Sequence, residues 1–424
     1  MPELSASELH NPLLQADPCL IAGMSQILRM AHHQEDLSPL WEGAMARASQ
    51  EPPSPAAMMD LAQILFCKGQ TDPGLRLQQM AVGLQRNYCV THGDGSGLRV
   101  LAFVASGDLM TNTPLDFLLH GSHCQLWLRY VDADTPDLAD LPAHDVAFVA
   151  IGESAATLPI LQRLKVLLRD WQGPILNHDP DTIMSLTRDG VSERFAAQPS
   201  ILAPRARRMS RDALSNAAAE LVFPVILRPV GTHAGNGMHL VNDAQMLVEC
   251  LAAETGDSFY VTPFIDYAGA DGLFHKQRVV LIEGKPYPSH LAISSHWMVH
   301  YLNAGMNESA AKRAVEEAWM RDFDQDFAAR HADAFAALYR EIGLDYFGID
   351  CAETSDGRLL LFELDVAMVV HDMDEDEIYR YKKPAMRRLF DAFLEMLARK
   401  SHGAAASGFS SLISSRLRGQ RICV

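Results

Sequence analysis

The sequence lacks an excess of basic residues. Its 424 residues include 36 Lys and Arg against 53 Asp and Glu, which gives a formal net charge of −17. Proteins that bind nucleic acid over a broad surface usually carry a basic excess, so this balance argues against that class. An anionic metabolite or a nucleotide needs only a local basic site, and such a site is compatible with an acidic total.

Long apolar runs, a secretory leader and paired cysteines are also lacking. No stretch approaches about 18 uninterrupted apolar residues, and the start Met1-Pro2-Glu3-Leu4 has no basic-then-apolar pattern. The seven cysteines are scattered without a CxxC pair, which argues against a disulfide framework and a zinc site. We therefore expect a cytoplasmic protein that binds neither a membrane nor nucleic acid.

Two familiar phosphate-binding motifs are absent as well. The glycine-rich segment 231–237, read GTHAGNG, follows an apolar stretch that contains Arg228 and Pro229. Its spacing fits neither G-x-G-x-x-G nor G-x-x-x-x-G-K-[ST]. The exposed N–H groups of such a segment can bind phosphate, but a flexible hairpin would have the same composition.

Periodicity divides the chain into regions. Residues 1–95 have helical spacing, and two helices around the break at 69–74 resemble a tetratricopeptide-like hairpin or form a plain helical cap. From 97 to 180, apolar strands alternate with helices, which predicts a small α/β domain with a mostly parallel sheet. Residues 401–424, rich in Ser, Ala and Gly, are typical of a flexible tail.

The most informative segment is a predicted β-hairpin from Tyr346 to Asp365. Asp356-Gly357 between apolar, β-prone runs is a strong turn signal. Counting back from a two-residue loop places Asp350 opposite Glu363, and Asp365 then shares their face. Like charges opposite one another destabilise a sheet, so we expect a cation between them. Three carboxylates without nearby Cys or His suit Mg²⁺ or Mn²⁺; the alternative is an exposed acidic strand face.

The order of these parts resembles the ATP-grasp superfamily, closest to its branch of glutathione synthetases and ribosomal-protein glutamate ligases. The shared order is an α/β domain, a strand ending in a cation and Pro, a glycine segment, an apolar hinge, a strand with Arg, and the acidic hairpin. The resemblance covers about 97–390. It implies an α/β and α+β fold, with a Rossmann-like domain at 97–180 and an ATP-grasp domain at 181–400 after the helical region 1–95.

The resemblance also implies a set of site residues. Arg228 and Arg278 would be the catalytic cations. Asp350, Glu363 and Asp365 would hold Mg²⁺ or Mn²⁺. The residues that would contact ATP are Arg188, Arg228, Gly231, Thr232, His233, Gly235, Gly237, Thr262, Phe264, Ile265 and Asp266. Candidates for the acceptor side, each of which a packing role would explain equally well, are His290, Ser294 and Asn303.

Three residues depart from the pattern of that superfamily. Pro263 stands where a hinge Glu is common, so ribose recognition must come from elsewhere, for which Asp266 is a candidate. Arg228 replaces the usual Lys, which keeps the charge and changes the hydrogen-bond geometry. Asp365 replaces an Asn and adds a negative charge that increases the need for a cation. None of these changes abolishes ATP binding on physical grounds.

The implied activity is that of an ATP-dependent ligase that joins a carboxylate to an amine through an acyl phosphate. The substrates would be small molecules or peptides, and the N-terminal helices are a candidate surface for a protein partner. The alternatives are a kinase that acts on a small molecule and a non-catalytic nucleotide-binding scaffold. The enzyme interpretation requires that Asp350, Glu363 and Asp365 converge beside a cleft under the glycine segment.

Overall fold

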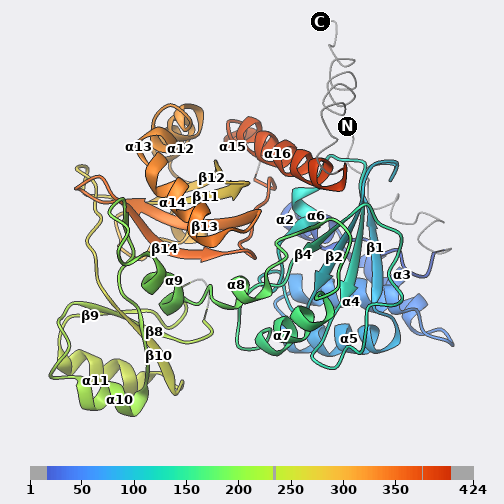
Figure 1. The fold of residues 1–424 in the computed structure, drawn as a ribbon, viewed down its shortest axis with the longest axis horizontal. Helices are drawn as coiled ribbons and strands as arrows, with labels where there is room; N and C mark the ends of the chain where they lie inside the picture. The colour runs from blue at the N-terminus through green and yellow to red at the C-terminus, as the bar shows by residue number, and fades with distance from the viewer. Residues whose placement is uncertain (1–16, 233–234, 375, 403–424) are drawn as a thin grey trace, which may run out of the picture.

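The computed structural model describes residues 17–232, 235–374 and 376–402 as a mixed α/β protein with three sheets. Figure 1 shows one mostly parallel sheet with its helices on the right, and two further sheets, one above the other, on the left. Among the described residues, no helix combines the length and the apolar composition that crossing a bilayer would need. Residues 401–402 of the predicted tail are helical, which corrects its start, and the rest of it, from 403 onward, lies outside the described residues.

The N-terminal helices cover one face of the first sheet. They are α2 (Met24–His32), α3 (Ser38–Ala48), α4 (Pro55–Cys67) and α5 (Thr71–Leu84). Helix α4 starts at the cap Ser54, whose hydroxyl accepts a hydrogen bond from the amide of Ala57 at 3.3 Å. Met59 and Val82 from these helices share a core with Leu126 of the sheet. This packing favours the helical cap, and a tetratricopeptide-like role in partner binding stays a prediction.

The first sheet has the order β1-β3-β2-β4-β5, and the prediction of a mostly parallel sheet is confirmed. Its strands are β1 (Asn87–Thr91), β2 (Arg99–Val104), β3 (Gln125–Tyr130), β4 (Val146–Val149) and β5 (Ile175–Leu176). The helices between them are α6 (Leu115–Leu118) and α7 (Leu158–Leu167).

Strand β1 corrects the prediction that residues 1–95 are helical. It pairs antiparallel with β3, and its side chain Tyr88 is buried in the shared core. The residues Tyr, Val and Thr favour strands, but a run of five between a helix and a turn is too short for a clear period. The helical region therefore ends at Leu84, and β1 belongs to the α/β domain.

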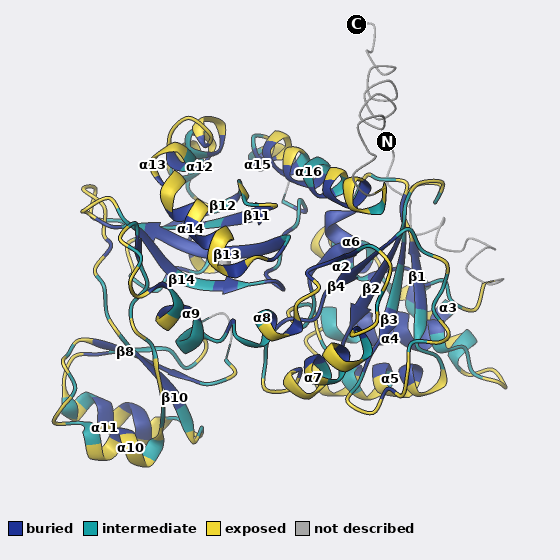
Figure 2. Cartoon of the chain, in the orientation of Figure 1, coloured by how far each residue is buried: buried dark blue, intermediate teal, exposed yellow. Residues whose placement is uncertain are grey.

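The second sheet forms a small lobe with two helices on one face. A linker with α8 (Pro180–Met184), α9 (Arg188–Phe195) and β6 (Ile201–Leu202) leads to it. The lobe contains β7 (Arg207–Ser210), α10 (Arg211–Ala217), β8 (Val225–Pro229), β9 (His239–Val241), α11 (Ala244–Ala253) and β10 (Ser258–Pro263), with strand order β7-β10-β8-β9. Helices α10 and α11 turn buried residues toward the strands and exposed ones outward (Figure 2).

The third sheet has the order β12-β11-β13-β14-β6. Its long strands are β11 (Phe274–Ile282), β12 (Lys285–Ser294), β13 (Tyr346–Glu353) and β14 (Leu359–Asp365). The accompanying helices are η1 (Tyr301–Asn303), α12 (Ala310–Asp322), α13 (Phe327–Arg330), α14 (Ala332–Ile342), α15 (Asp376–Tyr379) and α16 (Lys382–His402). Helix α16 joins the sheets, because Phe393 packs against Phe148 of β4 at 5.9 Å and Tyr346 of β13 at 5.3 Å.

The predicted hairpin is present as β13 and β14, with Asp350 directly opposite Glu363. The predicted two-residue loop is wrong. The strands pair as far as Glu353 and Leu359, so the loop is longer than two residues. Between the pairs Cys351–Leu361 and Asp350–Glu363 the register shifts by one residue, because Phe362 forms a bulge in β14. The bulge compensates for the longer loop. The predicted opposition is therefore confirmed, although the count that led to it contained two errors that cancel.

Candidate functional site

A cavity of about 500 Å³ lies between strand β14 of the third sheet and the strands β7, β8 and β10 of the lobe. This volume is within the range of pockets that bind a small molecule or cofactor. Four cationic side chains line it: Arg188, Arg208, Arg228 and Lys276. Three carboxylates do so as well: Glu153, Glu363 and Asp365. The cavity is therefore a charged site with both signs arranged around a common space.

Arg228 is a buried cation in the wall of this cavity. Its side chain projects from β8, and the residue is only 9% exposed. The guanidinium donates to the backbone carbonyl of Thr232 and, at 3.3 Å, to the Thr232 hydroxyl. Burial lowers the pKa of Arg228 to about 10, and the charge of Arg188 adds to this effect. Among the described residues no carboxylate forms an ion pair with Arg228, so the site favours an anionic ligand.

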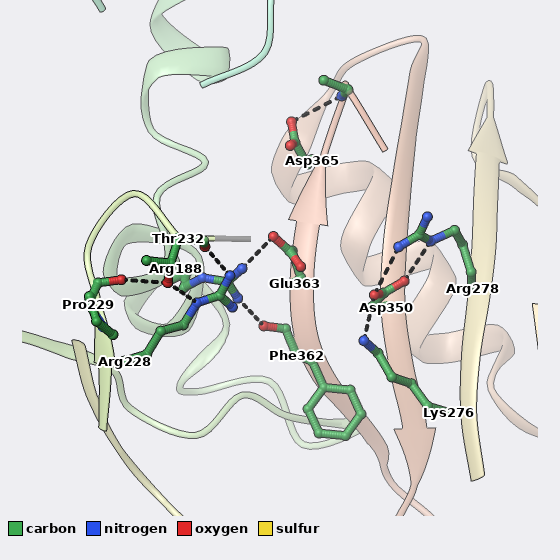
Figure 3. A network of polar contacts seen from close by, with 11 residues as sticks. Arg188, Arg228, Pro229, Thr232, Lys276, Arg278, Asp350, Phe362, Glu363 and Asp365 are labelled. Atoms are coloured by element: carbon green, nitrogen blue, oxygen red, sulfur yellow. Dashed lines mark hydrogen bonds and ion pairs between the residues drawn. The ribbon is translucent and has the colours of Figure 1, made fainter. Parts of the chain in front are cut away.

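Arg188 connects helix α9 to the acidic strand. It is the first residue of the helix, whose cap Thr187 accepts a hydrogen bond from the amide of Gly190 at 3.1 Å. Arg188 Nη2 lies 2.5 Å from Glu363 Oε1, as Figure 3 shows. Burial opposes ionisation of Glu363, but the charges of Arg188, Arg228 and Lys276 together lower the pKa of this carboxyl.

Asp350 lies in the middle of a row of charged residues that crosses three strands. Arg278 of β11 pairs with Asp350, and Asp350 pairs with Glu363. The Asp350 carboxylate accepts from Arg278 Nε at 2.8 Å and Nη2 at 3.1 Å, and it lies 2.7 Å from Lys276 Nζ. Burial opposes its ionisation, but Arg278 and Lys276 together hold the pKa of Asp350 well below its ordinary value.

The two facing carboxylates are turned in different directions. In Figure 3 the Asp350 carboxylate points toward Lys276 and Arg278, whereas Glu363 points toward Arg188. Asp350 is only 3% exposed and does not line the cavity. The predicted convergence of Asp350 with Glu363 and Asp365 is therefore not seen in this structure.

Asp365 ends strand β14 and lines the cavity. Its carboxylate accepts a hydrogen bond from the amide of Ala367 at 3.0 Å. Burial raises the pKa of Asp365 to about 7 against this bond, and the charge of Glu363 raises it further. Within the described ranges no Lys, Arg or His forms an ion pair with Asp365, so its charge is offset only by backbone hydrogen bonds.

A divalent cation fits two of the three predicted ligands. Within residues 17–232, 235–374 and 376–402, no three His, Cys, Asp or Glu side chains are close enough together to hold a metal ion. Mg²⁺ is commonly bound by one or two carboxylates together with substrate phosphates. Glu363 and Asp365 line the cavity on the same strand face and would suit such an ion. Asp350 does not, because it does not line the cavity and its carboxylate contacts two cations.

The predicted nucleotide contacts lie in the cavity only in part. Thr262, Phe264 and Ile265 line it beside Pro263, and the Phe264 ring packs on Trp297 at 5.9 Å. Gly231 and Thr232 line it as well. Three predicted contacts are not part of its wall: Gly235, Gly237 and Asp266. His233 lies outside the described residues.

The predicted acceptor residues lie away from this cavity. His290 pairs with Arg278 across β11 and β12, and its ring packs on Tyr301 at 4.6 Å. Neither His290 nor the catalytic candidate Arg278 lines the cavity, and the same holds for Ser294 and Asn303. Arg278 instead fixes Asp350 and donates to the carbonyl of Val369 at 2.9 Å. The functional roles of these four residues stay predictions.

Sequence reasoning missed three cavity residues. Lys276 lines the cavity and is ion-paired with Asp350; its place two residues before Arg278 on one strand face was an available signal. Arg208 reaches the cavity from β7, a strand that is recognisable only by its pairing with β10. Glu153 follows β4 of the α/β domain, and burial raises its pKa, with Asp189 adding to the effect.

Gly152 explains how Glu153 reaches the cavity from another domain. A Cβ at Gly152 would lie 2.6 Å from the Cβ of Ala367, which is closer than side chains pack. Glycine therefore allows the segment after β4 to lie against the residues that follow Asp365. The α/β domain contributes directly to the wall of the cavity in this way.

Models of known protein families do not match this chain, and no curated protein resembles it in sequence. The chain is similar to several solved structures at low identity. One is a RimK domain protein ATP-grasp from Sphaerobacter thermophilus, at 16% identity and a TM-score of 0.41, over 72% of this chain and 100% of that chain. Another is a D-alanine–D-alanine ligase from Coxiella burnetii, at 12% identity and a TM-score of 0.45, over 76% of this chain and 100% of that chain. A third is the VanG D-Ala:D-Ser ligase from Enterococcus faecalis, at 13% identity and a TM-score of 0.44, over 71% of this chain and 100% of that chain. TM-scores below 0.5 do not assign the chain to a family.

Proposed function

We propose that the cavity binds ATP with a divalent cation and that the protein is an ATP-dependent carboxylate–amine ligase. The observation that carries this proposal is the arrangement around Arg228. This buried cation has no carboxylate partner among the described residues, and it lines the same cavity as Asp365, which has no cationic partner among them. A polyphosphate carrying a divalent cation satisfies both groups at once, because its anionic part binds Arg228 and its cation binds Asp365.

The cavity is lined by apolar as well as charged side chains. Phe264 and Ile265 would hold the adenine ring by apolar contact. Arg228 and the backbone of Gly231 and Thr232 would bind the phosphates. Glu363 and Asp365 would hold Mg²⁺ or Mn²⁺, which when bound would offset negative charge on the phosphates. This assignment places the triphosphate between the lobe and the third sheet.

The proposed chemistry has two steps. A substrate carboxylate oxygen forms a bond to the γ-phosphorus while the bond to the ADP oxygen breaks, which gives an acyl phosphate and ADP. An amine nitrogen then attacks the acyl carbon, phosphate leaves with the electrons of the C–O bond, and the nitrogen loses a proton. Arg228 and Arg188 would stabilise the charge on the transferring group, because fixed cations in a water-poor site act strongly.

Exclusion of water is a requirement of this chemistry, since water hydrolyses an acyl phosphate. Gly235 lies against Met298, because a Cβ added at Gly235 would be 3.2 Å from the Met298 sulfur. Met298 itself lines the cavity. The contact between Gly235 and Met298 would therefore limit the access of water to the bound triphosphate.

The experiment that tests the ligase proposal follows both products of ATP. Purified protein is incubated with ATP, Mg²⁺ and pools of amino acids, peptides and carboxylic acids, and released phosphate and new masses are measured together. A ligase gives free phosphate and an amide product in equal amounts. A kinase gives a phosphorylated product without free phosphate. Absence of any phosphate release with every pairing contradicts the ligase proposal.

One observation favours a second candidate, a nucleotide-binding protein without catalysis. Asp350 is neutralised by Arg278 and Lys276 and is turned away from the cavity. The three-carboxylate arrangement on which the enzyme interpretation depended is therefore not formed here. A scaffold of this kind would bind ATP with Mg²⁺ but would leave it intact, so the phosphate measurement separates it from a ligase.

A further inference from the structure

Lys276 is the one cation that contacts both the cavity and Asp350 among the described residues. Its ammonium group lies 2.7 Å from Asp350 Oδ2, and its side chain, 22% exposed, lines the cavity. It also lies 5.9 Å from the centre of the Phe362 ring, which is the bulged residue between Leu361 and Glu363. Lys276 is therefore placed between the buried carboxylate and the space in which the phosphates would lie.

A purely structural role would not need this second cation. Arg278 already contacts both oxygens of Asp350, at 2.8 Å to Oδ1 and 3.1 Å to Oδ2. A bidentate Arg–carboxylate pair neutralises the charge and fixes its geometry. Adding Lys276 gives two cations for one carboxylate. The excess positive charge is on the cavity side, since Lys276 lines the cavity and Arg278 does not.

Phosphoryl-transfer sites often hold two divalent cations, which share a few carboxylates and the phosphate oxygens. The row of acidic residues on β13 and β14 would supply ligands for two such ions if all three carboxylates were free. Here Glu363 and Asp365 line the cavity, while the position beside Asp350 is taken by an ammonium group. The ammonium group of Lys276 therefore contacts the carboxylate that a second ion would need as a ligand.

We propose that Lys276 acts as a built-in counter-ion that replaces a second divalent cation, so that the site binds the nucleotide with one metal ion held by Glu363 and Asp365. Lys276 would contact Asp350 on one side and a phosphate oxygen on the other. This inference rests on the proposed nucleotide binding and adds to it the number of ions and a role for a residue of this chain.

The test counts metal ions. Mn²⁺ is titrated into protein saturated with AMP-PNP, a nucleotide that is not hydrolysed, and free Mn²⁺ is measured by electron paramagnetic resonance. Wild-type protein should bind one Mn²⁺ per nucleotide. Lys276→Met, which keeps the side-chain length without the charge, should bind two, because the lone pair of Asp350 Oδ2 that Lys276 contacts is then open to a second ion while Arg278 stays in place. The matched control is Lys285→Met, an exposed lysine at the start of β12, which should bind one.

Further variants keep the inference falsifiable. If Lys276→Met does not give the circular dichroism spectrum of the folded protein, Lys276→Gln takes its place. The double variant Lys276→Met with Asp350→Asn should return the count to one, because the second ion loses its ligand. Two ions in wild-type protein, or one ion in Lys276→Met, would overturn the role of Lys276 and leave the nucleotide site standing. No binding of AMP-PNP by wild-type protein at saturating Mn²⁺ would overturn the proposed function, and this inference with it.

Discussion

The hydroxyl of Thr113 donates a hydrogen bond of 2.9 Å to the backbone carbonyl of Val366, the residue that follows Asp365. This bond joins the α/β domain to the acidic strand of the third sheet. Two further contacts hold the segment that follows Asp365. Arg278 donates to the carbonyl of Val369 at 2.9 Å, and His120 Nδ1 lies 3.2 Å from Asp372 Oδ2. The position of Asp365 therefore depends on contacts from elements far apart in the sequence.

Replacing Thr113 by Val should destabilise the protein and weaken nucleotide binding together. Thr113 is buried, and the substitution keeps its shape but leaves the Val366 carbonyl without this donor. A buried polar group that loses its partner costs about 1–3 kcal/mol. Urea unfolding measures the first effect and calorimetric titration with AMP-PNP the second. The control Thr71→Val, at the exposed start of α5, should change neither. Equal stability of Thr113→Val and wild-type protein would contradict the role of this bond.

Asp365→Asn should increase stability while it weakens metal-dependent binding. An Asn oxygen can still accept from the Ala367 amide, and the variant removes a buried charge that lies near Glu363. The ligand-free protein should therefore melt at a higher temperature, as is common when a strained functional group is replaced. The affinity for AMP-PNP with Mg²⁺ should fall about tenfold or more, because one of the two proposed carboxylate ligands is neutral. Unchanged affinity would remove Asp365 from the metal site.

Asp60 should make stability fall as pH rises. This carboxyl on α4 is fully buried, and it accepts a hydrogen bond from the amide of Ala22 at 2.9 Å. Burial raises its pKa from 3.8 to about 7. Between about pH 4 and pH 7 the unfolded chain has lost this proton while the folded protein keeps it, so each pH unit costs up to about 1.4 kcal/mol.

The variant Asp60→Asn isolates this effect from other titrating groups. The difference between its unfolding free energy and that of wild-type protein should increase from about pH 4 to pH 7 and then stay constant at higher pH. Urea unfolding at several pH values measures the difference. A difference that is constant from pH 4 to pH 8 would show that Asp60 titrates in the same way in both states.

Sequence patterns gave the order of the elements but not their exact pairing. Alternation of apolar strands with helices predicted the parallel sheet, because a buried parallel strand is a continuous apolar run. Strand β1 was missed because its five residues show no period, and its pairing with β3 is set by tertiary contact. The Asp356-Gly357 turn predicted the hairpin, but neither the longer loop nor the bulge at Phe362 has a signal in the sequence.

The candidate site was predictable where it follows strand alternation. Glu363 and Asp365 share a face two residues apart, and both line the cavity. The direction of the Asp350 side chain was not predictable, because it is set by Lys276 and Arg278 on the neighbouring strand β11. Glu153 and Arg208 come from another domain and another sheet, so only the folded chain brings them to the cavity.

The central claim is that Arg228, which is buried and forms no ion pair among the described residues, binds the phosphates of ATP. Calorimetric titration with AMP-PNP in Mg²⁺ tests it most directly. Wild-type protein should bind the nucleotide, and removing Mg²⁺ should weaken binding. Arg228→Met should lower the affinity about tenfold or more, since a charge-assisted hydrogen bond contributes roughly 1.5–3 kcal/mol. Arg321→Met, on the exposed face of α12 and paired only with its neighbour Asp322 among the described contacts, should leave the affinity unchanged. Equal affinities of wild-type and Arg228→Met protein, or no binding by either, would contradict the account.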